Sequence, residues 1–149
     1  MPKMKILPFS RNLSTAAMIY LKSILNVIDN SGAIKAECIN ILKKGNKGFG
    51  QIGDRIVCVV KETRPPPPGM SGNALANRPV RGEVRHAVIV RTKKPILRKD
   101  GTSVRYDDNA CVLVNKAGDP IGTRIFGVVG KEVQFKNYNK ICALAPKVL

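Results

Sequence analysis

The side chains with the clearest chemical potential in this sequence are cations, and they are concentrated in one stretch. Residues 78–105 hold nine Lys and Arg residues against two acidic ones, Glu83 and Asp100. Ammonium and guanidinium groups at this density attract a polyanion, because their fields add over the surface. The predicted contacts with that polyanion are Arg78, Arg81, Arg85, Arg91, Lys93, Lys94, Arg98, Lys99 and Arg105.

A second basic cluster lies in a glycine-rich loop, KKGNKGFGQIGD, where Lys43, Lys44 and Lys47 are further candidates. Proteins that grip single strands stack bases on aromatic side chains, but the aromatic residues here are scattered and residues 78–105 contain none. Lys and Arg suit the phosphates and 2′-hydroxyls of folded RNA, which is recognised by shape. The predicted partner is therefore folded RNA.

The residues that could support catalysis lack the necessary context. Gly48 to Gly53 match G-x-G-x-x-G, but the β-branched run that follows offers no helix end for a phosphate. His86 is the sole imidazole, and the adjacent Asp107 and Asp108 would point to opposite faces of a strand. The sequence predicts no catalytic residue, cofactor or metal, and a nucleotide-dependent enzyme built on Gly48 to Gly53 is an alternative.

The four cysteines each lie within an apolar run and form no C-x-x-C pair, which argues against a zinc site. We expect buried thiols in a reducing compartment at Cys38, Cys58, Cys111 and Cys142. The longest nearly apolar window, residues 16–28, is interrupted by Lys22 and falls short of the ~20 residues that span a bilayer. With no basic amphipathic helix visible, no membrane association is predicted.

These side chains must be positioned by a chain that is mostly β. Short β-branched runs predict strands at residues 24–29, 36–43, 55–61, 84–91, 103–106 and 111–115. The 55–61 run, apolar nearly throughout, is expected to be buried on both faces, and Asp29 to Gly32 form a tight turn. Short helices are expected at residues 131–135 and 138–145. Such a series favours a small antiparallel β-barrel, with the cations on loops and one protruding basic hairpin.

The 149 residues and net charge of +16 fit one globular domain, predicted at residues 18–149, with a strongly basic surface. Residues 1–17 are a basic N-terminal extension with hydroxyl side chains, and no acidic residue precedes Asp29. That composition is typical of a mitochondrial targeting segment, and a basic tail is the alternative. Residues 64–83, with four consecutive prolines, are predicted to be the least regular part of the domain.

Six blocks of the sequence resemble the L-fourteen family of universal large-subunit ribosomal proteins in its bacterial and organellar form. They are LNVIDNSGA (25–33), GDRIVCVVK (53–61), RGEVRHAVIVRTKK (81–94), DGTSVRYDDNACVLVN (100–115), IGTRIFG (121–127) and KICALAPKVL (140–149). The resemblance implies a five-stranded barrel, ribosomal RNA binding at the subunit interface, and an intersubunit bridge to small-subunit RNA. It also implies neighbours from the L-three and L-nineteen families. The residues it implies for the protein interface, where a ribosome-silencing factor can dock in this family, are Thr123, Arg124 and Phe126.

The chain departs from the bacterial pattern at three places, two of which, the leader and the Pro-rich loop, indicate a mitochondrial member and a mitochondrial matrix location. The chain has an extra leader, a longer Pro-rich loop, and Lys147 where bacterial members usually have Glu. A bacterial or chloroplast ribosome is the alternative location. A free-standing RNA-binding module acting off the ribosome is the alternative function.

Overall fold

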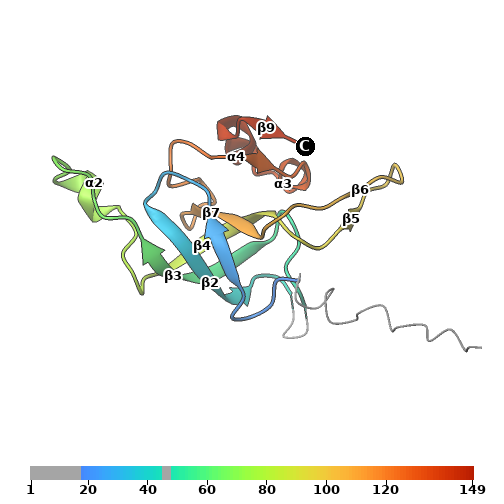
Figure 1. Cartoon of the computed structure of the whole chain (residues 1–149), viewed down its shortest axis with the longest axis horizontal. Helices are drawn as coiled ribbons and strands as arrows, with labels where there is room; N and C mark the ends of the chain where they lie inside the picture. Colours follow the sequence, from blue (N-terminus) through green and yellow to red (C-terminus); the bar gives the residue numbers. More distant parts are fainter. Residues whose placement is uncertain (1–17, 45–47) are drawn as a thin grey trace, which may run out of the picture.

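The computed structural model describes residues 18–44 and 48–149, which form a closed β-barrel with a small C-terminal layer against its wall (Figure 1). The barrel order is β1-β2-β3-β4-β7. Its strands are β1 (Ile24–Val27), β2 (Ala33–Ile41), β3 (Arg55–Thr63), β4 (Val84–Arg91) and β7 (Ala110–Val114). The other elements are β5 (Ile96–Leu97), β6 (Ser103–Val104), β8 (Val128–Val129), β9 (Lys147–Val148), α2 (Asn73–Ala76), α3 (Glu132–Phe135) and α4 (Asn139–Leu144). The predictions for Lys47 and residues 1–17 fall outside the described residues.

The prediction of a small β-barrel is confirmed, but its strands are not all antiparallel. Four of the five strand contacts are antiparallel, whereas β1 and β7 pair in parallel, with Asn26 opposite Ala110 and Val27 opposite Cys111. The reason is parity, because strand directions cannot alternate all the way round a closed ring with an odd number of members. A five-stranded barrel therefore needs at least one parallel contact.

Two apolar cores lie on opposite sides of the barrel wall. β4 alternates between them, since Ala87 and Ile89 face the barrel interior while Val88 and Val90 pack outward. The outer core lies under the C-terminal layer, where its members include Val133 and Ile141. Double coverage explains why every residue of β7 is buried.

The expectation that residues 55–61 are buried on both faces is wrong. In β3, Ile56, Cys58 and Val60 are fully buried in the barrel, but the residues between them are only half-buried. The C-terminal layer packs on β4 and β7 and leaves the outer face of β3 partly open to solvent.

The turn between β1 and β2 is confirmed, and it is tied to the neighbouring strand β7. Gly32 has φ +106°, a conformation that glycine adopts without strain. The carboxylate of Asp29 is buried and accepts hydrogen bonds from the Ser31 amide (3.2 Å), the Ser31 hydroxyl (2.5 Å) and the Leu113 amide (3.2 Å). Burial raises the pKa of Asp29, and these donors partly offset that effect.

Two segments project from opposite ends of the barrel (Figure 1). One is the loop that carries α2, whose residues are all exposed, and it corresponds to the predicted irregular stretch 64–83. The other is the hairpin of β5 and β6, as expected for a protruding basic arm. The two predicted C-terminal helices are present as α3 and α4. None of the helices in residues 18–44 and 48–149 is long and apolar enough to cross a membrane.

The four cysteines are free thiols, and Cys38, Cys58 and Cys111 are buried while Cys142 is half-buried. Burial raises the pKa of Cys38 to about 11 and that of Cys58 to about 12, and it raises the pKa of Cys111 well above the usual value. Because the thiolate is the reactive species, these three should resist modification. We therefore expect the folded protein to react with Ellman's reagent at pH 8 at Cys142 alone, and the urea-unfolded protein at all four.

The matched control is Cys142→Ser, which should leave the folded protein without a rapidly reacting thiol. Rapid labelling of two or more thiols in the folded wild-type chain would contradict the assignment of buried, inert cysteines.

Candidate nucleic-acid interface

The basic hairpin, defined here as residues 91–105 with β5 and β6 at its centre, has a sharply defined tip. The carboxylate of Asp100 accepts hydrogen bonds from the Thr102 amide (3.0 Å) and hydroxyl (2.6 Å). These two bonds lower the pKa of Asp100. One of the two acids in the basic stretch is thus used to form the turn, which leaves Lys99 and Arg105 exposed on either side of it.

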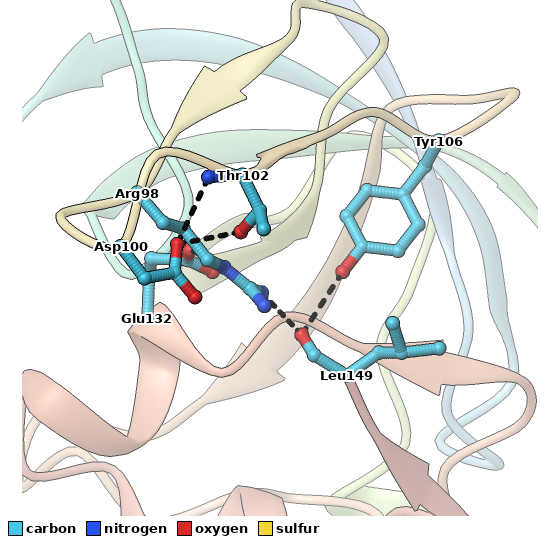
Figure 2. A network of polar contacts seen from close by, with 6 residues as sticks. All are labelled: Arg98, Asp100, Thr102, Tyr106, Glu132 and Leu149. Carbon is cyan, nitrogen blue, oxygen red and sulfur yellow. Dashed lines mark hydrogen bonds and ion pairs between the residues drawn. The ribbon is translucent and has the colours of Figure 1, made fainter.

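The hairpin is braced against the C-terminal layer (Figure 2). Arg98 donates from Nε to Glu132 of α3 at 2.9 Å and from Nη2 to the main-chain oxygen of Leu149. The Tyr106 hydroxyl donates to the same oxygen at 3.4 Å. The hydrogen bond to Glu132 raises the pKa of Arg98. The Arg98 guanidinium therefore bridges the hairpin to the body of the protein.

Three other predicted cations also lie against carboxylates of the same chain. Lys44 contacts Asp54 at 2.7 Å, Arg85 contacts Glu83 at 2.8 Å, and Arg91 contacts Asp108 at 3.2 Å. Burial acts to raise the pKa of Glu83, but the hydrogen bonds from the Val80 amide and then from Arg85 outweigh it and lower the pKa. Lys44, Arg85, Arg91 and Arg98 therefore each pair with a carboxylate of the protein itself. These pairs suit them to stabilise the conformation of the interface rather than to bind a partner directly.

Seven of the eleven predicted cations in the described chain make no ion pair with a carboxylate of residues 18–44 or 48–149. Arg78 is held by two neutral acceptors, the carbonyl oxygens of Arg64 (2.6 Å) and Pro65 (3.2 Å), and so keeps its net charge. These seven, here called the available cations, are Lys43, Arg78, Arg81, Lys93, Lys94, Lys99 and Arg105.

An aromatic ring joins the two basic clusters. The ammonium of Lys94 lies 3.8 Å from the centre of the Phe49 ring, and that of Lys44 lies 5.6 Å from it. A cation over the face of a ring is attracted by its quadrupole. Phe49 therefore places the glycine-rich loop beside the start of the basic hairpin. This role was not identified from the sequence, although an aromatic residue two positions after Lys47 in a basic loop indicates such a contact.

The interface segment, defined as residues 121–127, is fixed by one side chain. Asn30 Oδ1 accepts from the amides of Thr123 (2.7 Å) and Arg124 (3.2 Å), and its Nδ2 donates to the Thr123 hydroxyl (2.8 Å). Thr123, Arg124 and Phe126 are all exposed, and half of the Phe126 surface is open to solvent. The segment thus presents a cation and an aromatic ring on a rigid support.

The remaining candidates for chemistry have structural partners. His86 lies on β4 and its Nδ1 accepts a hydrogen bond from Arg55 Nε at 3.1 Å. Burial and then the charges of Arg55 and Lys116 lower the pKa of His86. The segment Gly48 to Gly53 leads into β3, so no helix follows it. Within the described residues no group of His, Cys, Asp and Glu could hold a metal ion.

Comparison with known proteins gives a consistent result over most of the chain. The sequence profile of the family described as "Ribosomal protein L14p/L23e" matches residues 18–149. A Neurospora crassa protein named "Large ribosomal subunit protein uL14m" is 54% identical over 130 residues, which are 87% of this chain and 98% of the relative. A Schizosaccharomyces pombe protein of the same name is 53% identical over 134 residues, which are 89% of this chain and 100% of the relative.

Proposed function

The chain belongs to the ribosomal protein L14p/L23e family, and we propose that it binds folded large-subunit ribosomal RNA through its available cations. It is a structural, non-enzymatic constituent of the large ribosomal subunit, and its location is mitochondrial. The observation that carries the RNA-binding proposal is the set of seven cations without a carboxylate partner in the described chain, most of them on the braced hairpin and the loop beside it.

The mode of binding follows from the kind of side chain that is exposed. Lys93, Lys99 and Arg105 are exposed on the hairpin and can reach phosphates on either side of it. The tether at Arg98 keeps the hairpin from moving freely, so less conformational entropy is lost when RNA binds. A preformed cationic arm of this kind is suited to RNA that is already folded.

The interface segment is the proposed contact with other components of the ribosome. Arg124 suits the backbone of small-subunit RNA across an intersubunit bridge, and Phe126 suits an apolar contact with a neighbouring protein. We propose ribosomal proteins of the L-three and L-nineteen families as the neighbours, and a ribosome-silencing factor as a transient partner of the same surface. Residues 1–17 are proposed to direct the chain to the mitochondrial matrix.

A variant that lacks three available cations tests the RNA-binding role. Lys93→Ala, Lys99→Ala and Arg105→Ala together should remove about three phosphate contacts. The slope of log affinity against log salt should then fall by nearly three units, by the duplex-DNA rule of about 0.9 per contact. The slope is measured by filter binding to a large-subunit RNA fragment at several salt concentrations.

The matched control removes three cations that already have surface partners. Lys35, Lys61 and Lys140 pair with Glu62, Glu37 and Asp119, so the triple Ala variant has the same net charge but should keep nearly the full salt slope. Equal slopes for the two triple variants would contradict specific binding by the hairpin. Cosedimentation of the wild-type chain with large subunits in high salt separates a stable ribosomal component from a free-standing RNA-binding module.

A further inference from the structure

A cavity of about 350 Å³ lies beside the start of β3, and no residue of the basic hairpin lines it. Its walls come from the turn after β2, from the residues that lead into β3, and from the chain after α3. Four cations and one carboxylate line it, an excess of three positive charges. The lining residues are Leu42, Lys43, Lys44, Gly53, Asp54, Arg55, Lys136 and Tyr138.

Arg55 is the fixed member of this cluster. Its Nε donates to His86 Nδ1 (3.1 Å), and its Nη2 donates to the carbonyl oxygens of Asn115 and Lys116, both at 2.8 Å. All three acceptors are uncharged, since a His86 Nδ1 that accepts a hydrogen bond carries no proton, and burial and then the charges of Arg55 and Lys116 lower the pKa of His86. The guanidinium is therefore held in place without neutralisation.

Lys136 is positioned by a glycine. Gly53 has φ +89°, and a Cβ atom built on it would lie 2.8 Å from Cγ of Lys136. The aliphatic stem of Lys136 therefore lies directly on the Gly53 backbone, where a larger residue would displace it. Lys43, from the turn after β2, also lines the cavity, has φ +62° and is exposed.

Asp54, the one carboxylate among the residues that line the cavity, already has two partners. Asp54 contacts Lys44 at 2.7 Å and accepts a hydrogen bond from the Gln51 amide at the same distance. Lys43, Arg55 and Lys136 consequently face the cavity without a carboxylate partner in the described chain. Like charges so arranged repel one another, and an anion placed among them removes that repulsion.

We propose that this cavity binds a phosphate group of the large-subunit RNA backbone, as a second anchor separate from the basic hairpin. The guanidinium and the two ammonium groups can donate to the two non-bridging oxygens of a phosphodiester, which share its negative charge. Tyr138 adds a phenol to the wall. The inference rests on the proposed RNA-binding function and adds Arg55 and Lys136 to its binding residues.

The test replaces the two exposed lysines of the cavity. The double variant Lys43→Gln, Lys136→Gln should lower the salt slope of RNA binding by about two units. Its control is Lys131→Gln, Lys147→Gln, which makes the same change in net charge at exposed positions outside the cavity and should leave the slope unchanged. Thermal melting and the two single variants establish that the fold is intact.

A second readout identifies the phosphate. Methylphosphonate groups, which carry no charge, are placed one at a time in the RNA fragment. At least one position should weaken binding to the wild-type chain and to the hairpin triple variant, yet have no effect on the cavity double variant. The same interference pattern for all three proteins would overturn the proposal.

The outcomes separate the cavity from the hairpin. Suppose that the hairpin triple variant shows a smaller salt slope than the wild type, while the cavity double variant has the same slope as its control. The cavity proposal is then wrong, and RNA binding by the hairpin is supported. If wild-type affinity does not respond to salt, the RNA-binding function itself falls. Weaker association with large subunits without any change in salt slope would assign the cavity to an acidic protein partner and overturn the phosphate assignment.

Discussion

Raising the salt concentration from about 50 to 200 mM should weaken the affinity of the wild-type chain for large-subunit RNA by about 10³- to 10⁴-fold. The reason is counterion release, because each phosphate neutralised by a cation frees a bound counterion. Six to ten such contacts correspond to losses of about 10³ to 10⁵ over this range. The seven available cations place the expected loss at the lower end.

The measurement is a filter-binding titration at a fixed concentration of magnesium, so that the fold of the RNA does not change with the monovalent salt. The control triple variant at Lys35, Lys61 and Lys140 should show nearly the same loss as the wild type. A change of less than tenfold in the wild-type affinity would show that the cations do not contact phosphates.

Leu113→Ala should lower the free energy of unfolding by about 2 to 5 kcal/mol. Leu113 is fully buried in the barrel interior on β7, and deleting most of its side chain loses transfer free energy and leaves a cavity. Because small domains are stable by only about 5 to 15 kcal/mol, the loss is a large share of the total. Urea denaturation followed by circular dichroism gives the value directly.

The same substitution at an exposed leucine is the control. Leu97 on β5 is 77% exposed, so Leu97→Ala should change stability by no more than about 0.5 kcal/mol. Comparable losses for the two variants would mean that the barrel interior does not hold the fold together.

Local sequence patterns were sufficient to predict where the strands lie, but not whether the outer face of each strand is buried. The run of apolar residues at 84–91 predicted β4, whose bounds in the structure are the same. The similar run at 55–61 led to the wrong prediction that both faces of β3 are buried. The C-terminal layer covers β4 and β7 and leaves the outer face of β3 partly open. Which face a distant segment will cover cannot be read from the periodicity of the covered strand.

For the candidate site, too, the sequence did not reveal contacts between residues that are far apart in the chain. The sequence indicated which residues are basic, but it could not show that Arg98 pairs with Glu132, 34 positions away. Arg55 and Lys136 lay outside the basic clusters, and only the fold brings them to one cavity. Asp29 was interpreted only as a turn residue, whereas it also accepts a hydrogen bond from Leu113 on the paired strand β7, 84 positions away. In each case the residue meets its partner only because the folded chain brings two distant segments together.

The parallel contact between β1 and β7 also governs the timing of folding. It joins residues 26–27 to residues 110–111, and the three other strands of the barrel all lie between them in sequence. Contacts between segments so far apart close slowly, since a long stretch of chain must be ordered first. During translation the hairpin of β1 and β2 must therefore wait, with one edge unpaired, until β7 has left the ribosome that is making it.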